Sequence, residues 1–336
     1  MKPFKIAMLQ CEFDERDECH SYHFAPFMDD CDPLVLKEVW PSSYQYHTDI
    51  NHPNEFANCE KIDGFEFVSV WDVQGLERAE RFSRYVDRRP RVCDTIEEAI
   101  DGVDAVFLAD GGGDGSKHLE WVTPILKKRL PVFIDKPFAD TYADAQAMVE
   151  LANKMETPFF TASILSFIPE VDTFKASWAR IPEPGQAVIK GVGPSNGAVI
   201  HGLALMQGLF GTGVEWVECM GDMPREIMHI HYANGMQVIL LNTAYATFDW
   251  FRCEVWSRTN RTNPPKRMYA QSDTIGDPEF LPGTATVVRL FKQMLETGKP
   301  PIPYAEPIEL AALMEAGLKA HESRERVFLR DVMGGE

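Results

Sequence analysis

The segment PVFIDKP, from Pro131 to Pro137, limits most closely how this chain can fold. Its three central apolar residues favour a packed β-strand. Pro137 has no amide hydrogen and disfavours a helical conformation at Lys136, so the strand must end there. Because ligands of open α/β sheets bind beyond the carboxyl ends of the strands, Asp135 and Lys136 are predicted to lie at the edge of a binding cleft.

Strand and helix patterns alternate through the first half of the chain, which predicts a parallel, doubly wound sheet. In the second half, strands follow one another with few helices, which predicts a mainly antiparallel open sheet. The length of 336 residues suggests about two domains. We therefore expect an α/β fold with a Rossmann-like domain over residues 1–160 and an α+β domain over residues 161–336, whose last helix packs back on the first domain.

Charge and composition limit the partners and the location of the protein. The net charge of −18 argues against binding to nucleic acid or to an anionic membrane surface. No apolar run has the length of a transmembrane helix, and the N-terminus lacks the features of a signal peptide. The seven cysteines include no Cys-x-x-Cys pair and are expected to be free thiols in a reducing compartment. We expect a cytoplasmic protein.

The segment after the first predicted strand departs from the dinucleotide-binding pattern. Where that pattern has G-x-G-x-x-G, this chain has QCEFDERDEC from Gln10 to Cys19, with no glycine and several acids. The acid expected at the end of the second strand is Asp72, so an insertion over about residues 11–64 is predicted. It contains a short helix near 20–28 and loops over 40–47 and 51–54, and its Tyr, Trp, His and Asn residues are of the types that contact ligands or partner chains.

A group of thiols and imidazoles in this insertion raises the question of a metal site. Cys11, Cys19, His20, His23 and Cys31 are of the types that bind zinc. Their spacing matches no standard zinc motif. We expect no metal here, and instead one or two of the histidines facing the cleft.

Polar residues at the predicted strand ends are candidates for cofactor binding. The glycine run after the strand at 103–109 is not a P-loop, because the Gly-Lys-Ser/Thr order is absent, but its amides can reach a ligand. Asp72 would hydrogen-bond a ribose diol and repel a 2′-phosphate, which favours NAD over NADP. The candidates are Gln10, Asp72, Asp110, Gly111, Gly112, His118, Asp135 and Lys136.

The order of several motifs resembles that of the Gfo/Idh/MocA oxidoreductases. These motifs are the strand DAVFL from Asp104, His118, the DKP turn, FTAS at 160–163, His201, and the tail from Thr297 to Ser323. The resemblance covers most of the chain except 11–64 and parts of 257–280. It implies an N-terminal Rossmann domain and a C-terminal domain whose open sheet is often used for oligomerisation, hence a homodimer or homotetramer.

The resemblance also implies hydride transfer between NAD(P) and a hydroxyl of a sugar, glycoside or cyclitol. Lys136 matches the lysine of the family's E-K-P motif, which would hydrogen-bond the reacting oxygen or the cofactor. His201 matches the family's helix histidine, which would act as acid or base on the same hydroxyl. The site implied by the resemblance therefore places Lys136 and His201 in one cleft.

Three departures from the family pattern leave more than one function open. The glycine-rich loop is missing, Gly197 and Ala204 stand where the family often has Asp, and Ser166 stands for a frequent Arg. The first interpretation is a divergent NAD(P)-dependent dehydrogenase. The alternatives are a non-catalytic paralogue that binds a sugar or a partner chain, and a lyase or isomerase in which the hydride returns to the product.

Overall fold

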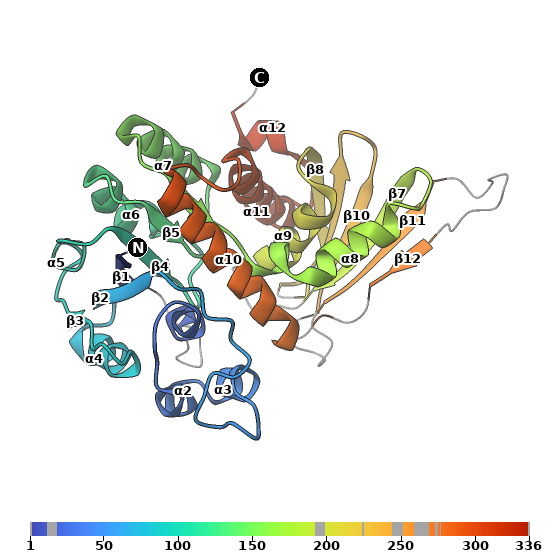
Figure 1. The fold of residues 1–336 in the computed structure, drawn as a ribbon. Coiled ribbons are helices and arrows are strands. Elements are labelled where there is room, and N and C mark those ends of the chain that lie inside the picture. The colour runs from blue at the N-terminus through green and yellow to red at the C-terminus, as the bar shows by residue number, and fades with distance from the viewer. Residues whose placement is uncertain are drawn as a thin grey trace. The chain divides into compact units, whose positions relative to one another are not determined.

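The computed structural model describes residues 2–11, 19–191, 199–223, 225–243, 251–258, 269–272, 275 and 277–334 (Figure 1). The chain forms two compact units. Unit 1 comprises Met1–Ala139, Gln146–Ala162 and Thr284–Tyr304, and unit 2 comprises Asp140–Ala145, Ser163–Gly283 and Ala305–Glu336. Residues 12–18, which belong to the segment that stands in place of a glycine-rich loop, lie outside the described residues.

Unit 1 is built on a six-stranded parallel sheet in the order β3-β2-β1-β4-β5-β6. Its strands are β1 Phe4–Gln10, β2 Phe65–Asp72, β3 Arg91–Val92, β4 Ala105–Ala109, β5 Val132–Ile134 and β6 Phe159–Thr161. The strand order reverses between β1 and β4, as in doubly wound folds. Gln10 pairs in register with Asp72 on one side and with Ala109 on the other, so the carboxyl ends of three strands meet at one edge. The predicted Rossmann-like sheet is confirmed.

Helices and an aromatic cluster cover this sheet. The helices are α4 Leu76–Tyr85, α5 Ile96–Ala99, α6 His118–Lys127, α7 Tyr142–Met155 and α10 Asp277–Thr297. The first residues of α7 and α10 are assigned to unit 2 and the remainder of each helix to unit 1. Phe107 of β4 and Phe133 of β5 stack with their ring centroids 4.4 Å apart, and Phe291 of α10 lies 5.5 Å from Phe107. All three rings are fully buried, and burying side chains of this size gives the largest favourable term in folding.

The inserted region is part of the core of unit 1. It contains α1 His20–Phe24, the 3₁₀ helix η1 Ala25–Phe27, α2 Pro33–Val39 and α3 Pro41–His47. Phe24 is 2% exposed and contacts both Phe107 and Phe133. The predicted loop over 40–47 is wrong: Pro41 occupies the first position of α3, where its missing amide hydrogen costs nothing.

Two buried histidines of the insertion form hydrogen bonds: His23 bonds to α10, and His47 bonds within the insertion. Nε2 of His23 lies 2.6 Å from Oγ1 of Thr284, and His47 Nδ1 donates to the carbonyl oxygen of Ser43 over 2.7 Å. Burial lowers the pKa of His47 to about 4, because charging an imidazole in an apolar interior costs solvation energy. Burial also lowers the pKa of His23, so both rings serve as neutral packing groups at neutral pH.

Unit 2 is built on a seven-stranded sheet in the order β12-β11-β7-β10-β9-β8-β13. Its strands are β7 Pro184–Gly191, β8 Val214–Met220, β9 Ile227–Tyr232, β10 Gln237–Asn242, β11 Arg252–Ser257, β12 Tyr269–Gln271 and β13 Val327–Phe328. Among the described strand pairs of this sheet, only β7–β10 is parallel, which confirms the mainly antiparallel sheet.

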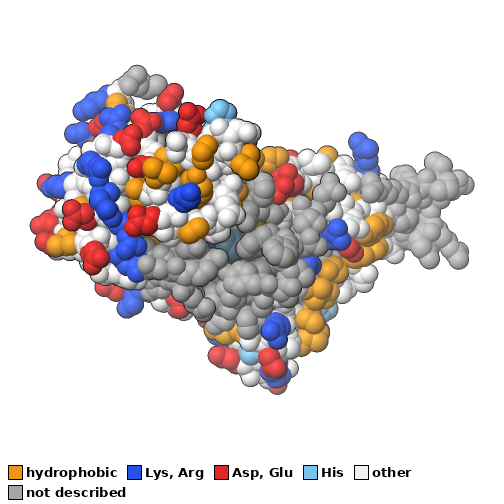
Figure 2. Space-filling view, turned by 90° about the horizontal axis from the view of Figure 1, so that it is seen from below, with side chains coloured by type: hydrophobic (Ala, Val, Ile, Leu, Met, Phe, Trp, Pro, Cys, Tyr) orange, Lys and Arg blue, Asp and Glu red, His pale blue; other side chains and the backbone are white. Residues whose placement is uncertain are grey.

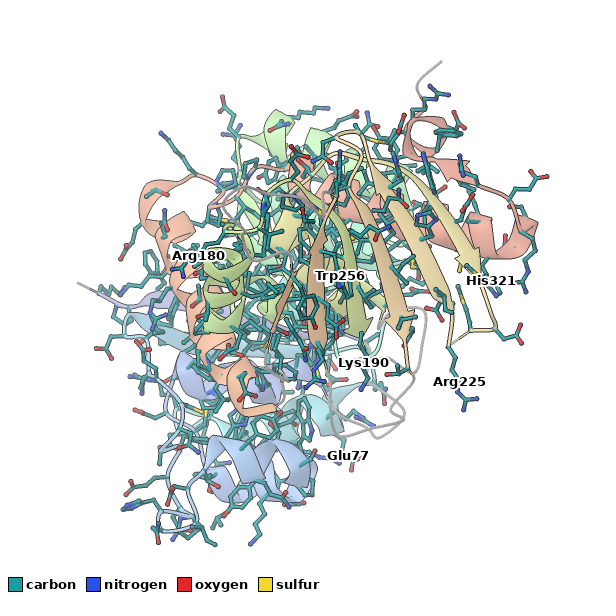
Figure 3. The ribbon with its side chains drawn as sticks, turned by 90° about the vertical axis from the view of Figure 1, so that its right-hand side faces the viewer. Glu77, Arg180, Lys190, Arg225, Trp256 and His321 are labelled. Atoms are coloured by element: carbon teal, nitrogen blue, oxygen red, sulfur yellow. The ribbon has the colours of Figure 1, made fainter. Side chains whose placement is uncertain are left out.

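Within the part of the chain that the structure describes, one face of this sheet is covered and the other is open. The covering elements are η2 Ile164–Phe167, α8 Pro169–Trp178, α9 Val199–Phe210, α11 Ala305–Ser323 and α12 Leu329–Val332. Helix α9 comes so close to β10 that a Cβ on Gly202 would lie 2.6 Å from the Leu240 side chain. Lys190 of β7 and Trp256 of β11 lie on the open face (Figure 3).

Surface charges are of mixed sign. On the face shown in Figure 2, the described basic and acidic side chains are interspersed. All seven cysteines are free. None of the described helices combines the length and the apolar character that crossing a membrane requires.

Candidate functional site

Four polar residues gather at the carboxyl edge of the unit 1 sheet. Gln10 ends β1, Asp72 ends β2, Asp110 follows β4 and Asp135 follows β5. Each is at most 3% exposed, and Lys136 is 8% exposed. Charged side chains are almost never buried without partners, so three carboxylates at one edge indicate a built site rather than a solvated surface.

Asp135 is the central acceptor of this edge. Its Oδ1 accepts from the amide of Lys136 over 2.8 Å, and its Oδ2 accepts from the amide of Asp110 over 3.1 Å. The β5 strand positions it, because the Asp135 amide continues the ladder by donating to the carbonyl of Leu108 on β4. One carboxylate therefore fixes the backbone at the ends of two neighbouring strands.

Asp110 and His118 form a fully buried pair beside it. Nε2 of His118 lies 3.0 Å from Oδ2 of Asp110, and its Nδ1 lies 3.1 Å from the carbonyl oxygen of Phe138. Both ring nitrogens face an oxygen acceptor, and a neutral imidazole can donate from only one of them. A ring that donates a hydrogen bond from each nitrogen carries two protons, so His118 is an imidazolium opposite an ionised Asp110.

The pKa shifts of the pair agree with this protonation. Burial acts to lower the pKa of His118, but the hydrogen bond and charge of Asp110 outweigh it and raise that pKa. Burial acts to raise the pKa of Asp110, but the hydrogen bond and charge of His118, together with the charge of Lys136, lower it. The pair is neutral as a whole, so it stays buried without an uncompensated charge.

Backbone amides of the glycine run after β4 donate hydrogen bonds to Asp110 within the protein itself. Oδ1 of Asp110 accepts from the amides of Gly112 and Gly113 over 3.1 Å and 2.7 Å. A Cβ on Gly113 would lie 2.3 Å from Oδ2 of Asp110, and Gly115, at φ +86°, approaches the carbonyl oxygen of Pro137. The Gly112 amide is thus already used within the loop, and binding of a cofactor by Gly111 and Gly112 stays a prediction.

Lys136 carries the one cation of the β5 turn. Its backbone is fixed by Asp135 and Pro137. Within the described residues, its ammonium group has neither a hydrogen bond nor an ion pair, although the residue is only 8% exposed. Its charge helps to lower the pKa of Asp110, but no described side chain contacts the ammonium directly, which is typical of a group that meets a ligand.

Asp72 and Gln10 leave two acceptor atoms for a cofactor. Oδ1 of Asp72 accepts from the amide of Gln74 over 2.7 Å, whereas its buried Oδ2 has no partner among the described residues. Gln10 donates to Oγ of Ser21 over 2.6 Å, and its buried Oε1 also has no described partner. The two residues are neighbours in register. Ribose hydroxyl groups of NAD are donors that fit these two oxygens.

His20 is a site residue whose partner could not be predicted from the sequence. Its Nδ1 lies 2.8 Å from Oδ2 of Asp135, and its side chain is 23% exposed. The ring lies nearly parallel to that of Trp40, with the centroids 6.2 Å apart. The sequence predicted that a histidine of the insertion lies near the cleft. It gave no signal for the contact of His20 with Asp135, because these two residues lie far apart in the chain.

His201 lies on α9 of unit 2. Its Nδ1 is 3.1 Å from Oγ of Ser163, the residue that caps η2. Lys136 belongs to unit 1, so the pairing of Lys136 with His201 stays a prediction. The described residues contain no group of three or more His, Cys, Asp or Glu side chains arranged to hold a metal ion.

Comparisons with known proteins agree with this architecture. The Gfo/Idh/MocA family model, described as an oxidoreductase family with an NAD-binding Rossmann fold, matches residues 42–163. No curated protein matches the chain.

Solved structures share the fold at low sequence identity. The myo-inositol dehydrogenase from Lactobacillus casei, in complex with NAD(H) and myo-inositol, has a TM-score of 0.71 and 16% identity, with 97% of each chain covered. An oxidoreductase from Agrobacterium radiobacter, in complex with NAD⁺, L-tartaric acid and magnesium, has a TM-score of 0.68 and 14% identity, with 98% of this chain and 99% of that chain covered. Residues 42–163 of the chain thus match the Gfo/Idh/MocA oxidoreductase family model, and the six-stranded sheet of unit 1 agrees with the NAD-binding Rossmann fold that this model describes.

Proposed function

We propose that this protein is an NAD-dependent dehydrogenase that oxidises a hydroxyl group of a sugar, glycoside or cyclitol. The observation that carries the proposal is the ammonium group of Lys136, which stands at the carboxyl edge of the Rossmann sheet without a partner among the described residues. The neighbouring Asp110 is already neutralised by His118. The charge of Lys136 is therefore available to an oxygen of the substrate.

The chemistry follows from what hydride removal requires. NAD, when bound, supplies the hydride acceptor. Hydride cannot leave an alcohol carbon unless the hydroxyl proton is also removed, so the site needs a cation for the developing alkoxide and a proton acceptor. Lys136 supplies the cation, and the resemblance gives His201 the acid–base role.

The substrate class rests on the family and on what related structures contain. The Lactobacillus casei enzyme is named for myo-inositol and was solved with it. A cyclitol presents adjacent hydroxyl groups, which match a site made of a cation, carboxylates and imidazoles. We propose a cytoplasmic enzyme and a polyol of this class as its small-molecule substrate.

We also propose that the open face of the unit 2 sheet joins copies of the chain into a homodimer or homotetramer.

Asp72 provides the test for the cofactor. Burial raises the pKa of Asp72 to about 7 from the ordinary value of 3.8. Between these values the folded state holds a proton that the unfolded state has lost, so this residue makes stability fall as the pH rises through that interval. Asp72→Asn should therefore raise the free energy of unfolding without cofactor at pH 8, by no more than about 4 kcal/mol.

The same variant should bind NAD more weakly, by about tenfold, because a charge-assisted hydrogen bond to the ribose is lost. Its preference for NAD over NADP should shrink, since the carboxylate no longer repels a 2′-phosphate. Calorimetry with NAD and NADP, beside urea unfolding at pH 8, measures both effects. Asp94→Asn, an exposed acid in the same unit, is the matched control. Unchanged NAD affinity in Asp72→Asn would exclude Asp72 from the cofactor site.

A further inference from the structure

We propose that His20 is an additional catalytic residue, whose Nε2 accepts the hydroxyl proton of the substrate beside Lys136. This inference rests on the proposed dehydrogenase function and assigns to unit 1 a proton acceptor of its own. The family resemblance assigns the role of proton acceptor to His201, which belongs to unit 2.

The first support is the orientation of the ring. Nδ1 of His20 points at the Asp135 carboxylate over 2.8 Å, and that carboxylate acts as an acceptor toward the amides of Asp110 and Lys136 as well. Nδ1 therefore carries the proton, and in the neutral ring Nε2 is the free base. A carboxylate that holds one imidazole nitrogen and leaves the other to take a proton is the arrangement that general-base histidines use.

The second support is the exposure of the ring. Asp135 is 2% exposed and the His20 side chain is 23% exposed, so the ring is held by a buried carboxylate and is itself partly open to solvent. Within the described residues, Nε2 has no hydrogen-bond partner. The Trp40 ring lies within 12° of parallel to the imidazole and limits its rotation. A base held in this way keeps its geometry while it remains open to a ligand.

The third support is the shared anchor with Lys136. The same Asp135 carboxylate fixes the His20 ring through Oδ2 and the Lys136 backbone through Oδ1. Among the described residues, the titratable groups shown to interact with the ring are Asp135 and His23, and Asp110 reaches the same carboxylate through its backbone amide. The base and the cation are thus positioned by one buried group at the edge where Rossmann folds bind ligands.

The step balances with NAD as the oxidant. The C–H bond of the carbinol carbon breaks and its electron pair leaves as hydride to the nicotinamide, which is reduced to NADH. The O–H bond breaks, its electron pair forms the C=O bond, and the proton goes to Nε2 of His20. Lys136 stabilises the oxygen while negative charge develops on it. In the reverse direction, the imidazolium returns the proton.

The test compares three variants in NAD-dependent oxidation of a panel of polyols that begins with myo-inositol. His20→Gln keeps a donor toward Asp135 but cannot take the proton, so kcat/KM should fall by about 10²-fold. The pH dependence of kcat/KM should change as well, because the glutamine side chain has no ring nitrogen that takes a proton. His52→Gln, an exposed histidine of the same insertion, should keep wild-type values. Activity that remains in His201→Gln would show that His20 accepts the hydroxyl proton without His201.

A second measurement does not depend on turnover. In ¹⁵N spectra of the histidine rings, the signal absent from His20→Gln should show the proton on Nδ1, and NADH with myo-inositol should shift its Nε2. A proton on Nε2, or unchanged kinetics and pH profile in His20→Gln, would overturn the role of His20 alone. Wild-type protein that neither binds NAD nor forms NADH would overturn the proposed function, and with it the catalytic role.

Discussion

Replacement of Lys136 by Met is expected to lower kcat for polyol oxidation by about 10²–10³-fold, the usual cost of removing one group that stabilises a developing oxyanion. The loss should appear in kcat more than in KM, because the charge on the oxygen grows only on the way to the transition state. Met has a similar length and fills the same space without the charge. Stability should change little, since the ammonium makes no hydrogen bond or ion pair within the described residues and only its longer-range interaction with Asp110 is lost.

Lys117→Met is the matched control for this prediction. Lys117 lies in the loop after β4, but its side chain is 57% exposed and its contact with Glu120 is a surface ion pair. Such pairs contribute little, so activity and stability should both remain near wild type. Steady-state kinetics and urea unfolding of the two variants give the comparison. Full activity in Lys136→Met would remove Lys136 from the chemistry, and a large loss of stability would make it a structural residue instead.

The largest loss of stability is expected from Asp110→Ala. The substitution leaves the His118 imidazole fully buried without its carboxylate, and it leaves the amides of Gly112 and Gly113 without their acceptor. Removing one partner of a buried ion pair typically costs about 3–5 kcal/mol. Urea unfolding should show a loss of this order.

Asp110→Asn separates charge from hydrogen bonding. The Asn oxygen can still accept from the two glycine amides, and its amide group can donate to Nε2 of a neutral His118. The loss should therefore be smaller than in Asp110→Ala. Equal losses in the two variants would contradict the ion pair.

The pH dependence of the pair has a defined sign. The stability that Asp110 contributes is present above its unfolded pKa of 3.8 and is lost as the pH falls, because its folded pKa is lowered. The contribution of His118 is present below its unfolded pKa of 6.5 and is lost as the pH rises through its raised folded pKa. The difference between wild type and Asp110→Ala should thus be largest at pH values between 3.8 and 6.5 and smaller in alkaline solution.

Most of the fold of unit 1 could be predicted from local pattern. Pro137 ends β5, and the apolar runs before Asp72 and Asp110 mark β2 and β4, because strands buried on both faces are continuous in apolar residues. Helices α2 and α3 of the insertion were missed. Each begins at a proline, which suits the first turn of a helix as well as a loop, so the signal is ambiguous.

The candidate site was predictable only in part. The strand-end rule correctly brought Asp72, Asp110 and Asp135 to one edge. The internal use of the Gly112 and Gly113 amides by Asp110 depends on how the loop folds back, which composition does not specify. The contact of His20 with Asp135 depends on how the insertion packs on the sheet, and helix-forming or loop-forming tendencies carry no information about such a pair.

The central claim is that this chain moves a hydride between a polyol carbon and NAD. The most direct measurement incubates the protein with NAD⁺ and with polyols deuterated at their carbinol carbons, beginning with myo-inositol, and analyses the cofactor by mass spectrometry. We expect NADH that carries one deuterium, and with it a ketone product. Product formed without net NADH would instead indicate a lyase or isomerase. Absence of both NAD binding and labelled NADH across the panel would contradict the dehydrogenase account.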